Sequence, residues 1–302
     1  MTTATRNPAP VAAALRAGAG TRRRLTNRAM TGLFTLAFLA AVTPLALVLV
    51  FTVARGAHRL DATFFTHSMA GVAASDPGGG AYAAIVGTVE QVALTAAMAV
   101  PLGIAAAVYL VEYGRGALAG AVRFFVDVMT GIPSIVAGLF VFAFWVLALG
   151  RGFSGFGGAL ALGVLMLPVV VRSTEEMLRL VPRDLREASF ALGVPRWRTI
   201  ASVVLPTAAS GITTGVMLAV ARVTGETAPL LLTVFGNSYI HLDPFHGLQD
   251  ALPLFVFKQA GQAYQPAIDR AWTGALTLIV IVMALYVGAR LLTRRGALSA
   301  RR

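Results

Sequence analysis

Cysteine is absent from this sequence, and lysine occurs once, at Lys258. Without cysteine the chain has no disulfide, no thiolate nucleophile, no iron–sulfur cluster and no Cys-ligated zinc. Lys258 does not stand in a G-x-x-x-x-G-K-[ST] string, so the chain carries no P-loop. If ATP drives its work, a partner subunit hydrolyses that ATP. We expect neither a catalytic residue nor a cofactor.

Charged residues are also scarce. They make up 13% of the 302 residues, against 57% for hydrophobic residues, whereas ordinary soluble proteins carry about 25% charged residues. Several apolar runs approach or exceed the ~20 residues that a bilayer-spanning helix needs. The chain is therefore expected to be an all-α, polytopic membrane protein, and its net charge of +12 does not indicate nucleic-acid binding.

Six apolar runs predict six transmembrane helices. The expected spans are residues 30–53, 82–111, 124–149, 159–171, 203–235 and 271–292. The first run is longer than the apolar core of a signal peptide and lacks a clear cleavage site, so we expect it to be retained. The Arg-rich residues 1–29 have too little apolar surface to fold and predict a disordered tail. Residues 30–302 are then the membrane domain, with charged connections at 112–123 and 172–200.

Basic residues are unevenly distributed over the connections between these spans. Of the 25 Lys and Arg residues, 19 fall on the side of the two termini and of residues 172–200, and five fall on the other side. Because Lys and Arg concentrate in cytoplasmic loops, both termini and residues 172–200 are expected in the cytoplasm. The remaining basic residue, Arg222, lies within the fifth apolar run.

Residues 182–206 are an arginine-rich, soluble-looking stretch between two apolar runs. A short helix is predicted from Pro182 to Leu192 and ends at Gly193, because glycine tolerates the positive φ found just past many helices. Pro195 suits the first turn of a second helix, where a missing N–H costs nothing. We therefore expect two short helices joined by a sharp turn.

The same stretch resembles the EAA signature of ABC importer permeases, which reads Glu-Ala-Ala, then Gly, then Ile-x-Leu-Pro. The matching residues are Glu187, Ala188, Gly193, Leu205 and Pro206. Ser189 replaces the second Ala, and Val203 replaces the Ile. In that family the loop is a coupling helix that docks on the ATPase subunit, and the resemblance implies this role for residues 172–200.

Two charged residues, Arg222 and Glu226, interrupt the fifth apolar run. A charge at the bilayer centre costs roughly 2.5–3.5 kcal/mol, so each should face protein or water. On one helix they share a face with three small residues that predict close packing: Gly211, Gly215 and Ala219. Two interpretations stay open, a salt bridge between helices or a positive site in an anion path with Glu226 as its partner. A helix break at Gly225 or Pro229 would remove Glu226 from this face.

Two further strings carry a narrower resemblance. Residues 131–140 read GIPSIVAGLF, and residues 221–231 read ARVTGETAPLL. With the EAA-like loop between them, they resemble the PstA-type permease family of high-affinity phosphate importers, over about residues 79–292. The resemblance implies the type I importer permease fold, a bacterial plasma (inner) membrane location and phosphate as the substrate. It also implies three partners: a second, PstC-type permease, a cytoplasmic ATPase dimer and an extracytoplasmic phosphate-binding protein.

Other functions fit the residues less well. Residues 152–155 match the G-x-S-G string of intramembrane serine proteases, but no His lies in an apolar run to activate Ser154. His241 and His246 share a polar loop, and we expect solvated side chains there rather than a metal site. A secondary transporter would not need the EAA-like loop. A permease of the same architecture for sulfate, molybdate or another solute stays open.

Overall fold

The computed structural model describes residues 21–299 of the chain. Within that range the regular structure is helical, and the one strand-like pairing is an isolated bridge between Phe235 and Gln249. Five helices are long and apolar enough to span a membrane, and one bent pair of helices provides a sixth span. The all-α fold class predicted from the sequence is confirmed. The chain divides into two units, residues 1–53 and 54–302, and each is described by itself.

Helix α2 (Thr21–Gly56) makes up the described part of the first unit, apart from its last three residues. It holds the first apolar run, with Pro44 inside it. Residues 21–29 were expected in the disordered tail but are helical, because a helix formed by an apolar run extends readily into flanking Arg, Leu and Ala residues. The rest of that expected tail, residues 1–20, lies outside the described residues.

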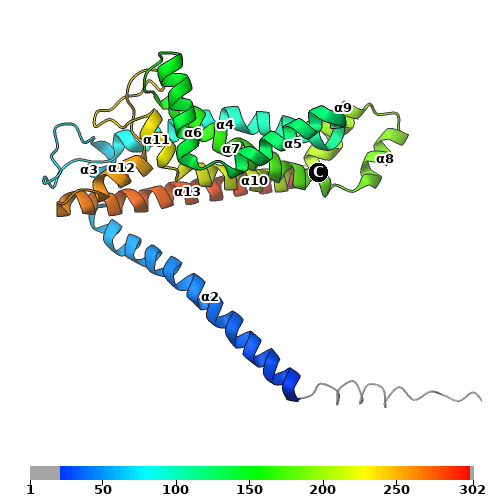
Figure 1. Ribbon diagram of the computed structural model, residues 1–302, viewed down its shortest axis with the longest axis horizontal. Helices are drawn as coiled ribbons and strands as arrows, with labels where there is room; N and C mark the ends of the chain where they lie inside the picture. Colours follow the sequence, from blue (N-terminus) through cyan, green and yellow to red (C-terminus); the bar gives the residue numbers. More distant parts are fainter. Residues whose placement is uncertain (1–20, 300–302) are drawn as a thin grey trace, which may run out of the picture. The chain divides into compact units, whose positions relative to one another are not determined.

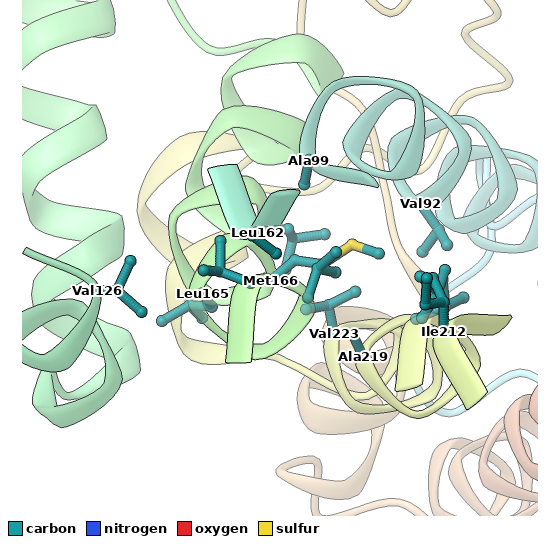
Figure 2. Packing of buried hydrophobic residues seen from close by; sticks show 14 of the residues in the cluster. Val92, Ala99, Val126, Leu162, Leu165, Met166, Ile212, Ala219 and Val223 are labelled. Carbon is teal, nitrogen blue, oxygen red and sulfur yellow. The ribbon is translucent and has the colours of Figure 1, made fainter. Parts of the chain in front are cut away.

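Four long helices form the core of the second unit: α4 (Tyr82–Val108), α7 (Gly155–Arg179), α10 (Leu205–Thr224) and α13 (Gln265–Ser299). Helix α7 packs against both α4 and α10, and α13 runs along α10 (Figure 1). Figure 2 shows Met166 of α7 between Ala99 of α4 and Ala219 of α10, and all three are buried. Helix α7 is therefore the central element of this bundle.

Small residues let these helices approach closely. A Cβ added at Gly103 of α4 would lie 2.7 Å from Val170 Cγ1 of α7. A Cβ at Gly215 of α10 would lie 2.5 Å from Ser173 Cβ of α7. In a bilayer, helix association depends on such packing because the lipid is as apolar as the helix surface.

Helix α7 is longer than predicted. The sequence predicts a short span over residues 159–171, because charged residues begin at Arg172. The helix instead continues to Arg179, since its charges are paired: Glu175 accepts a hydrogen bond from Arg179 at 2.5 Å, and Arg172 pairs with Asp127. The first part of the expected loop 172–200 is thus the end of α7.

Ser154 caps the start of α7. Its buried hydroxyl oxygen accepts hydrogen bonds from the N–H of Gly157 (3.2 Å) and from Trp145 Nε1 (3.1 Å). An N-cap serine satisfies one of the free N–H groups of the first helical turn. The G-x-S-G string therefore has a structural explanation.

The third span is broken. Helix α5 (Gly116–Gly131) and helix α6 (Ser134–Val141), which continues as the wide-turn segment η3 (Phe142–Ala148), meet at 109°. The prediction of one helix over residues 124–149 is wrong, because Pro133 forces Ile132 into an extended conformation. The expected charged turn 112–123 is also mostly helical, since η2 (Tyr109–Tyr113) extends α4 and α5 starts at Gly116.

The short helices gather at the two ends of the second unit. At one end lie α8 (Arg183–Ala191) and α9 (Arg196–Thr199), and the wide-turn segment η4 (Ile200–Val204) leads from α9 into α10 (Figure 1). At the other end lie α3 (Ala62–Thr66), α11 (Ala228–Thr233) and α12 (Leu252–Ala260). Helix α12 and the start of α13 fall in residues 236–270, where a polar loop was expected.

Candidate functional site

The fifth apolar run is not one helix. Helix α10 ends at Thr224, and α11 starts at Ala228. Two backbone N–H groups at the break donate to carbonyls of the last turn of α10. The Gly225 N–H donates to the Arg222 carbonyl (3.3 Å), and the Glu226 N–H donates to the Val223 carbonyl (3.1 Å). The sequence predicts one span over residues 203–235. The run breaks instead, because α10 ends just before Gly225 and Pro229 stands in the first turn of the next helix.

Helix α11, which follows this break, packs against α6, which follows the break of the third span. A Cβ added at Gly138 of α6 would lie 2.6 Å from Pro229 Cα of α11. The strings 131–140 and 225–231, which lie far apart in the sequence, are therefore in contact. Irregular backbone at membrane depth is tolerated where it is buried in protein or lines a cavity.

The break separates Arg222 from Glu226. Arg222 lies in the last turn of α10 and is exposed, whereas Glu226 lies beyond the helix and is half-buried. Neither side chain makes a hydrogen bond or an ion pair with another residue of the described range 21–299. The expectation that both continue one helix face is wrong for Glu226, and the two do not form a salt bridge.

Two neighbouring faces of α10 differ in character. The face toward α7 is made of small or apolar residues: Gly215 and Ala219 are buried, and Gly211 lies against Met177. The exposed face carries Thr207, Ser210, Thr214 and Arg222 within about 120° of one another, with the exposed Leu218 among them. The hydroxyl groups of Thr207 and Thr214 donate to backbone carbonyls four residues earlier. Lipid does not favour the charge of Arg222, so a protein partner or a water-filled path is expected to cover this residue.

Helix α8 ends in a glycine turn of the Schellman type. Gly193 has a φ of +76°, its N–H donates to the Phe190 carbonyl (2.9 Å), and the Val194 N–H donates to the Ser189 carbonyl (3.2 Å). Nothing lies within 4 Å of a Cβ added at Gly193, so the backbone conformation, not space, requires glycine. The predicted pair of short helices joined by a sharp turn is confirmed.

A hydrogen bond between two buried hydroxyl groups joins these short helices. Ser189 Oγ of α8 lies 2.9 Å from Thr199 Oγ1 of α9, and both residues are buried. Ser189 is one of the two residues that depart from the EAA pattern. Nothing in the sequence pairs residue 189 with residue 199.

Arginine side chains anchor α8 to the ends of the spans. Arg186 donates to Glu112 Oε1 from Nε (3.1 Å) and Nη2 (2.9 Å), and Glu112 is buried at the end of α4 and η2. Its Nη1 and Nη2 also donate to the carbonyls of Val181 (2.7 Å) and Leu178 (2.9 Å). Arg186 therefore links α8 to the ends of two transmembrane helices.

This loop exposes both apolar and charged side chains. Leu180, Leu192 and Trp197 are 73%, 83% and 67% exposed, and Glu187 and Ala188 of the EAA-like string are exposed as well. Large apolar residues left exposed outside the transmembrane helices are typical of a protein-interaction surface.

The last two residues of the EAA-like string lie at the start of α10. Pro206 lacks an N–H and displaces the carbonyl of the preceding turn, which accounts for the wide turns of η4. Leu205 is half-buried. These residues shape the entry into α10 and do not contribute to the exposed apolar surface.

A buried polar network holds the loop before α12. Gln91 of α4 donates to Gln249 Oε1 (3.0 Å) and to the Asp250 carbonyl (3.1 Å), and Gln249 donates to Glu90 at 2.5 Å. Burial raises the pKa of Asp250 to about 7. Its Oδ1 has no hydrogen-bond partner among the described residues. The sequence does not predict this network, because isolated Gln and Asp residues in a loop form no spacing pattern that would indicate a buried site.

The described residues contain no group of three His, Cys, Asp or Glu side chains placed to hold a metal ion. His246 Nδ1 lies 2.8 Å from Asp243 Oδ2 in an exposed loop. The His241 ring contacts the His246 carbonyl.

Comparison with known proteins defines the class of this chain. Residues 99–298 match the family model of the binding-protein-dependent transport system inner membrane component. The chain is therefore the multi-pass inner-membrane component of such a system, and ATP hydrolysis takes place on a separate subunit.

Full-length relatives narrow the class. The phosphate transport system permease protein PstA 1 of Mycobacterium tuberculosis is 47% identical over 282 residues, which cover 92% of each chain. The PstA protein of Mycobacterium leprae is 47% identical over 91% of each chain, and that of Pasteurella multocida is 38% identical over 89% of this chain and 95% of its own. The chain belongs to the PstA family of phosphate transport system permeases.

Solved structures agree on the fold. A bacterial ABC transporter that imports the acidic polysaccharide alginate aligns over 91% of this chain and 96% of its own, with a TM-score of 0.59 and 15% identity. The MetNI methionine ABC transporter in an inward-facing conformation aligns over 71% and 93%, with a TM-score of 0.56 and 19% identity. The predicted importer permease fold is confirmed.

Proposed function

We propose that this chain imports inorganic phosphate across the inner membrane, through a path that it shares with a second, PstC-type permease. The observation that carries the proposal is Arg222, an exposed cation without a partner in the described chain on the polar face of a membrane span. An uncompensated guanidinium beside a water-filled path attracts oxyanions, and its planar donors match phosphate geometry. The phosphate transport names of its full-length relatives support the same substrate.

The partner permease follows from the same face of α10. One chain leaves Thr207, Ser210, Thr214 and Arg222 uncovered, and a second permease would face them across the path. Glu226 lies two residues past the end of α10 at Thr224 and belongs to the broken segment between α10 and α11. We assign it to the same path, as a carboxylate that orients Arg222 when the partner is present.

Coupling to ATP hydrolysis is assigned to α8 and α9, within residues 172–200. Their exposed apolar residues fit a groove on a cytoplasmic ATPase dimer, with Glu187 and Ala188 at the contact and the Gly193 turn fixing the angle between the two helices. Arg186 transmits the movement to the spans. The permease domain is residues 30–302, with its core at about 79–292, and the opposite end of the bundle receives an extracytoplasmic phosphate-binding protein.

Both termini and α8 are placed in the cytoplasm, on the strength of the arginine distribution. Because the chain has no native cysteine, single-cysteine variants at exposed positions test this orientation without background. A cysteine at Arg198 should react with an impermeant maleimide only after the cells are opened, whereas one at Tyr239 should react in intact cells with a permeable outer membrane. The reverse pattern would overturn the orientation.

The substrate is tested by uptake of labelled phosphate in phosphate-starved cells that lack their own high-affinity importer. Uptake that needs this chain, and that excess sulfate or molybdate does not inhibit, is the expected result. Inhibition of uptake by sulfate or molybdate would favour a permease of the same architecture for another oxyanion.

A further inference from the structure

Arginine side chains line an open cavity of about 690 Å³ between α8 and the ends of the neighbouring helices. Four arginines contribute to its wall from three helices: Arg123, Arg179, Arg183 and Arg186. The carboxylates in the wall are Glu112 and Glu187. We call this cavity the arginine groove. Its volume falls within the range of cavities that bind small molecules.

The carboxylates accept hydrogen bonds from only some of the arginine N–H groups in this groove. Arg186 is fully engaged with Glu112 and two carbonyls. Arg123 and Arg179 share Glu175, at 3.5 and 2.5 Å, and their side chains remain 39% and 60% exposed. Several of their N–H groups therefore still point to solvent.

Arg183 differs from the other three. It makes no hydrogen bond or ion pair with another residue of the described part of the chain. Four guanidinium groups in the wall thus face two carboxylates in the wall, those of Glu112 and Glu187. Glu175, outside the wall, pairs with Arg123 and Arg179 and also with Arg172 at 3.8 Å. Like charges held together in this way favour an anion between them.

We propose that the arginine groove binds a phosphate-bearing anion, either free inorganic phosphate or the phosphate of an anionic lipid headgroup. Guanidinium groups bind phosphate oxygens through paired N–H donors, and basic pockets at the cytoplasmic ends of spans suit lipid phosphates. Arg183 supplies the free donors, and Arg123 and Arg179 supply the remainder.

The position of the groove means that a bound anion would contact α8 and the ends of the neighbouring helices. Helix α8 forms one wall, and the ends of α7 and of α4 with η2 form others. A bound anion would brace α8 against these ends, beside the Arg186–Glu112 contact. If α8 contacts the ATPase, as the proposed function holds, occupancy of the groove regulates ATP hydrolysis. The binding itself does not depend on that function.

Binding is tested on the purified full chain in lipid nanodiscs. Free phosphate is measured by equilibrium dialysis of labelled inorganic phosphate in discs of phosphatidylcholine alone. Lipid is measured by native mass spectrometry of discs that also contain phosphatidylglycerol. Both measurements use an Arg222→Gln background, so that the proposed transport path does not contribute.

The decisive variant is Arg183→Gln, because Arg183 has no hydrogen-bond or ion-pair partner among the described residues to lose, and the fold should be unaffected. Arg198→Gln is the matched control, an exposed arginine of the same loop that does not line the groove. We expect Arg183→Gln to weaken binding about tenfold or more and Arg198→Gln to leave it unchanged.

Saturable binding of inorganic phosphate that depends on Arg183 identifies the free anion as the ligand. Retention of phosphatidylglycerol that depends on Arg183, without phosphate binding, identifies the lipid. Absence of both, or binding that Arg183→Gln leaves unchanged, overturns the proposal. Uptake is measured separately, so failure of transport and failure of this site remain distinguishable.

Discussion

Arg186 and Glu112 form a two-point contact between α8 and the end of α4 and η2, with Nε and Nη2 of Arg186 at 3.1 and 2.9 Å from the same carboxylate oxygen. Arg186 also donates to two carbonyls at the end of α7. One guanidinium therefore ties α8 to two transmembrane helices.

Replacing Glu112 by Gln should weaken this contact. A charge-assisted hydrogen bond contributes about 1.5–3 kcal/mol, so we expect a loss of that order in the free energy of unfolding in mixed micelles. Because α8 would then move without the spans, ATP hydrolysis by the assembled importer should continue while phosphate uptake per ATP falls.

A double-mutant cycle separates the energy of the Arg186–Glu112 interaction from unrelated loss of stability in each single variant. Arg186→Gln, Glu112→Gln and the double variant should show a coupling energy of at least about 1 kcal/mol, since the two residues are in contact. Additive effects on stability would contradict the assigned contact. An unchanged uptake-to-ATP ratio would contradict the transmission role.

The close packing of α6 against α11 depends on Gly138. A methyl group there would lie 2.6 Å from Pro229 Cα, and backbone cannot move aside as a flexible side chain can. Gly138→Ala should therefore destabilise the protein by about 1–3 kcal/mol. Gly163→Ala is the control, since nothing lies within 4 Å of its added Cβ and Ala is favoured within a helix. Equal stability of the two variants would refute the close contact.

Asp250 should make stability depend on pH. Burial raises its pKa from 3.8 to about 7, so the folded state holds the proton more tightly than the unfolded state. The stabilisation is full below the unfolded pKa and is lost as the pH rises through about 7. Asp250→Asn does not titrate, so its stability relative to the unmodified protein should increase from about pH 5 to pH 8, by at most about 1.4 kcal/mol per pH unit.

Unfolding of both proteins in detergent over this pH range measures that difference directly, because the other titrating groups are common to both. A stability difference that stays constant with pH would mean that Asp250 is ionised at both ends of the range.

Sequence reasoning predicted the all-α fold and the α8–α9 turn, because glycine and proline act locally at Gly193 and Pro195. It named Gly225 and Pro229 as positions where the fifth span could break, but it did not predict the break in the third span. Pro133 and Gly225 tolerate either a kinked helix or a full break, and the contact between Gly138 and Pro229 decides between them. No local pattern encodes a contact between residues so far apart.

The candidate site was likewise predicted only in part from the sequence. Arg222 was identifiable because a charge in an apolar run is costly, whereas the placement of Glu226 depended on the break. The anchoring of Arg186 by Glu112 and the Ser189–Thr199 hydrogen bond join separate segments of the chain. Composition and spacing do not reveal such pairings, so these residues emerged only from the three-dimensional arrangement.

Arg222→Gln tests the central claim most directly. Uptake of labelled phosphate is compared between cells that carry the intact chain and cells that carry the variant at matched membrane levels, together with the unfolding of both purified proteins. Because Arg222 is exposed and has no partner in the described chain, we predict a loss of uptake of about tenfold or more with unchanged stability. Uptake that persists at the level of the intact chain would contradict the assignment of Arg222 to the phosphate path.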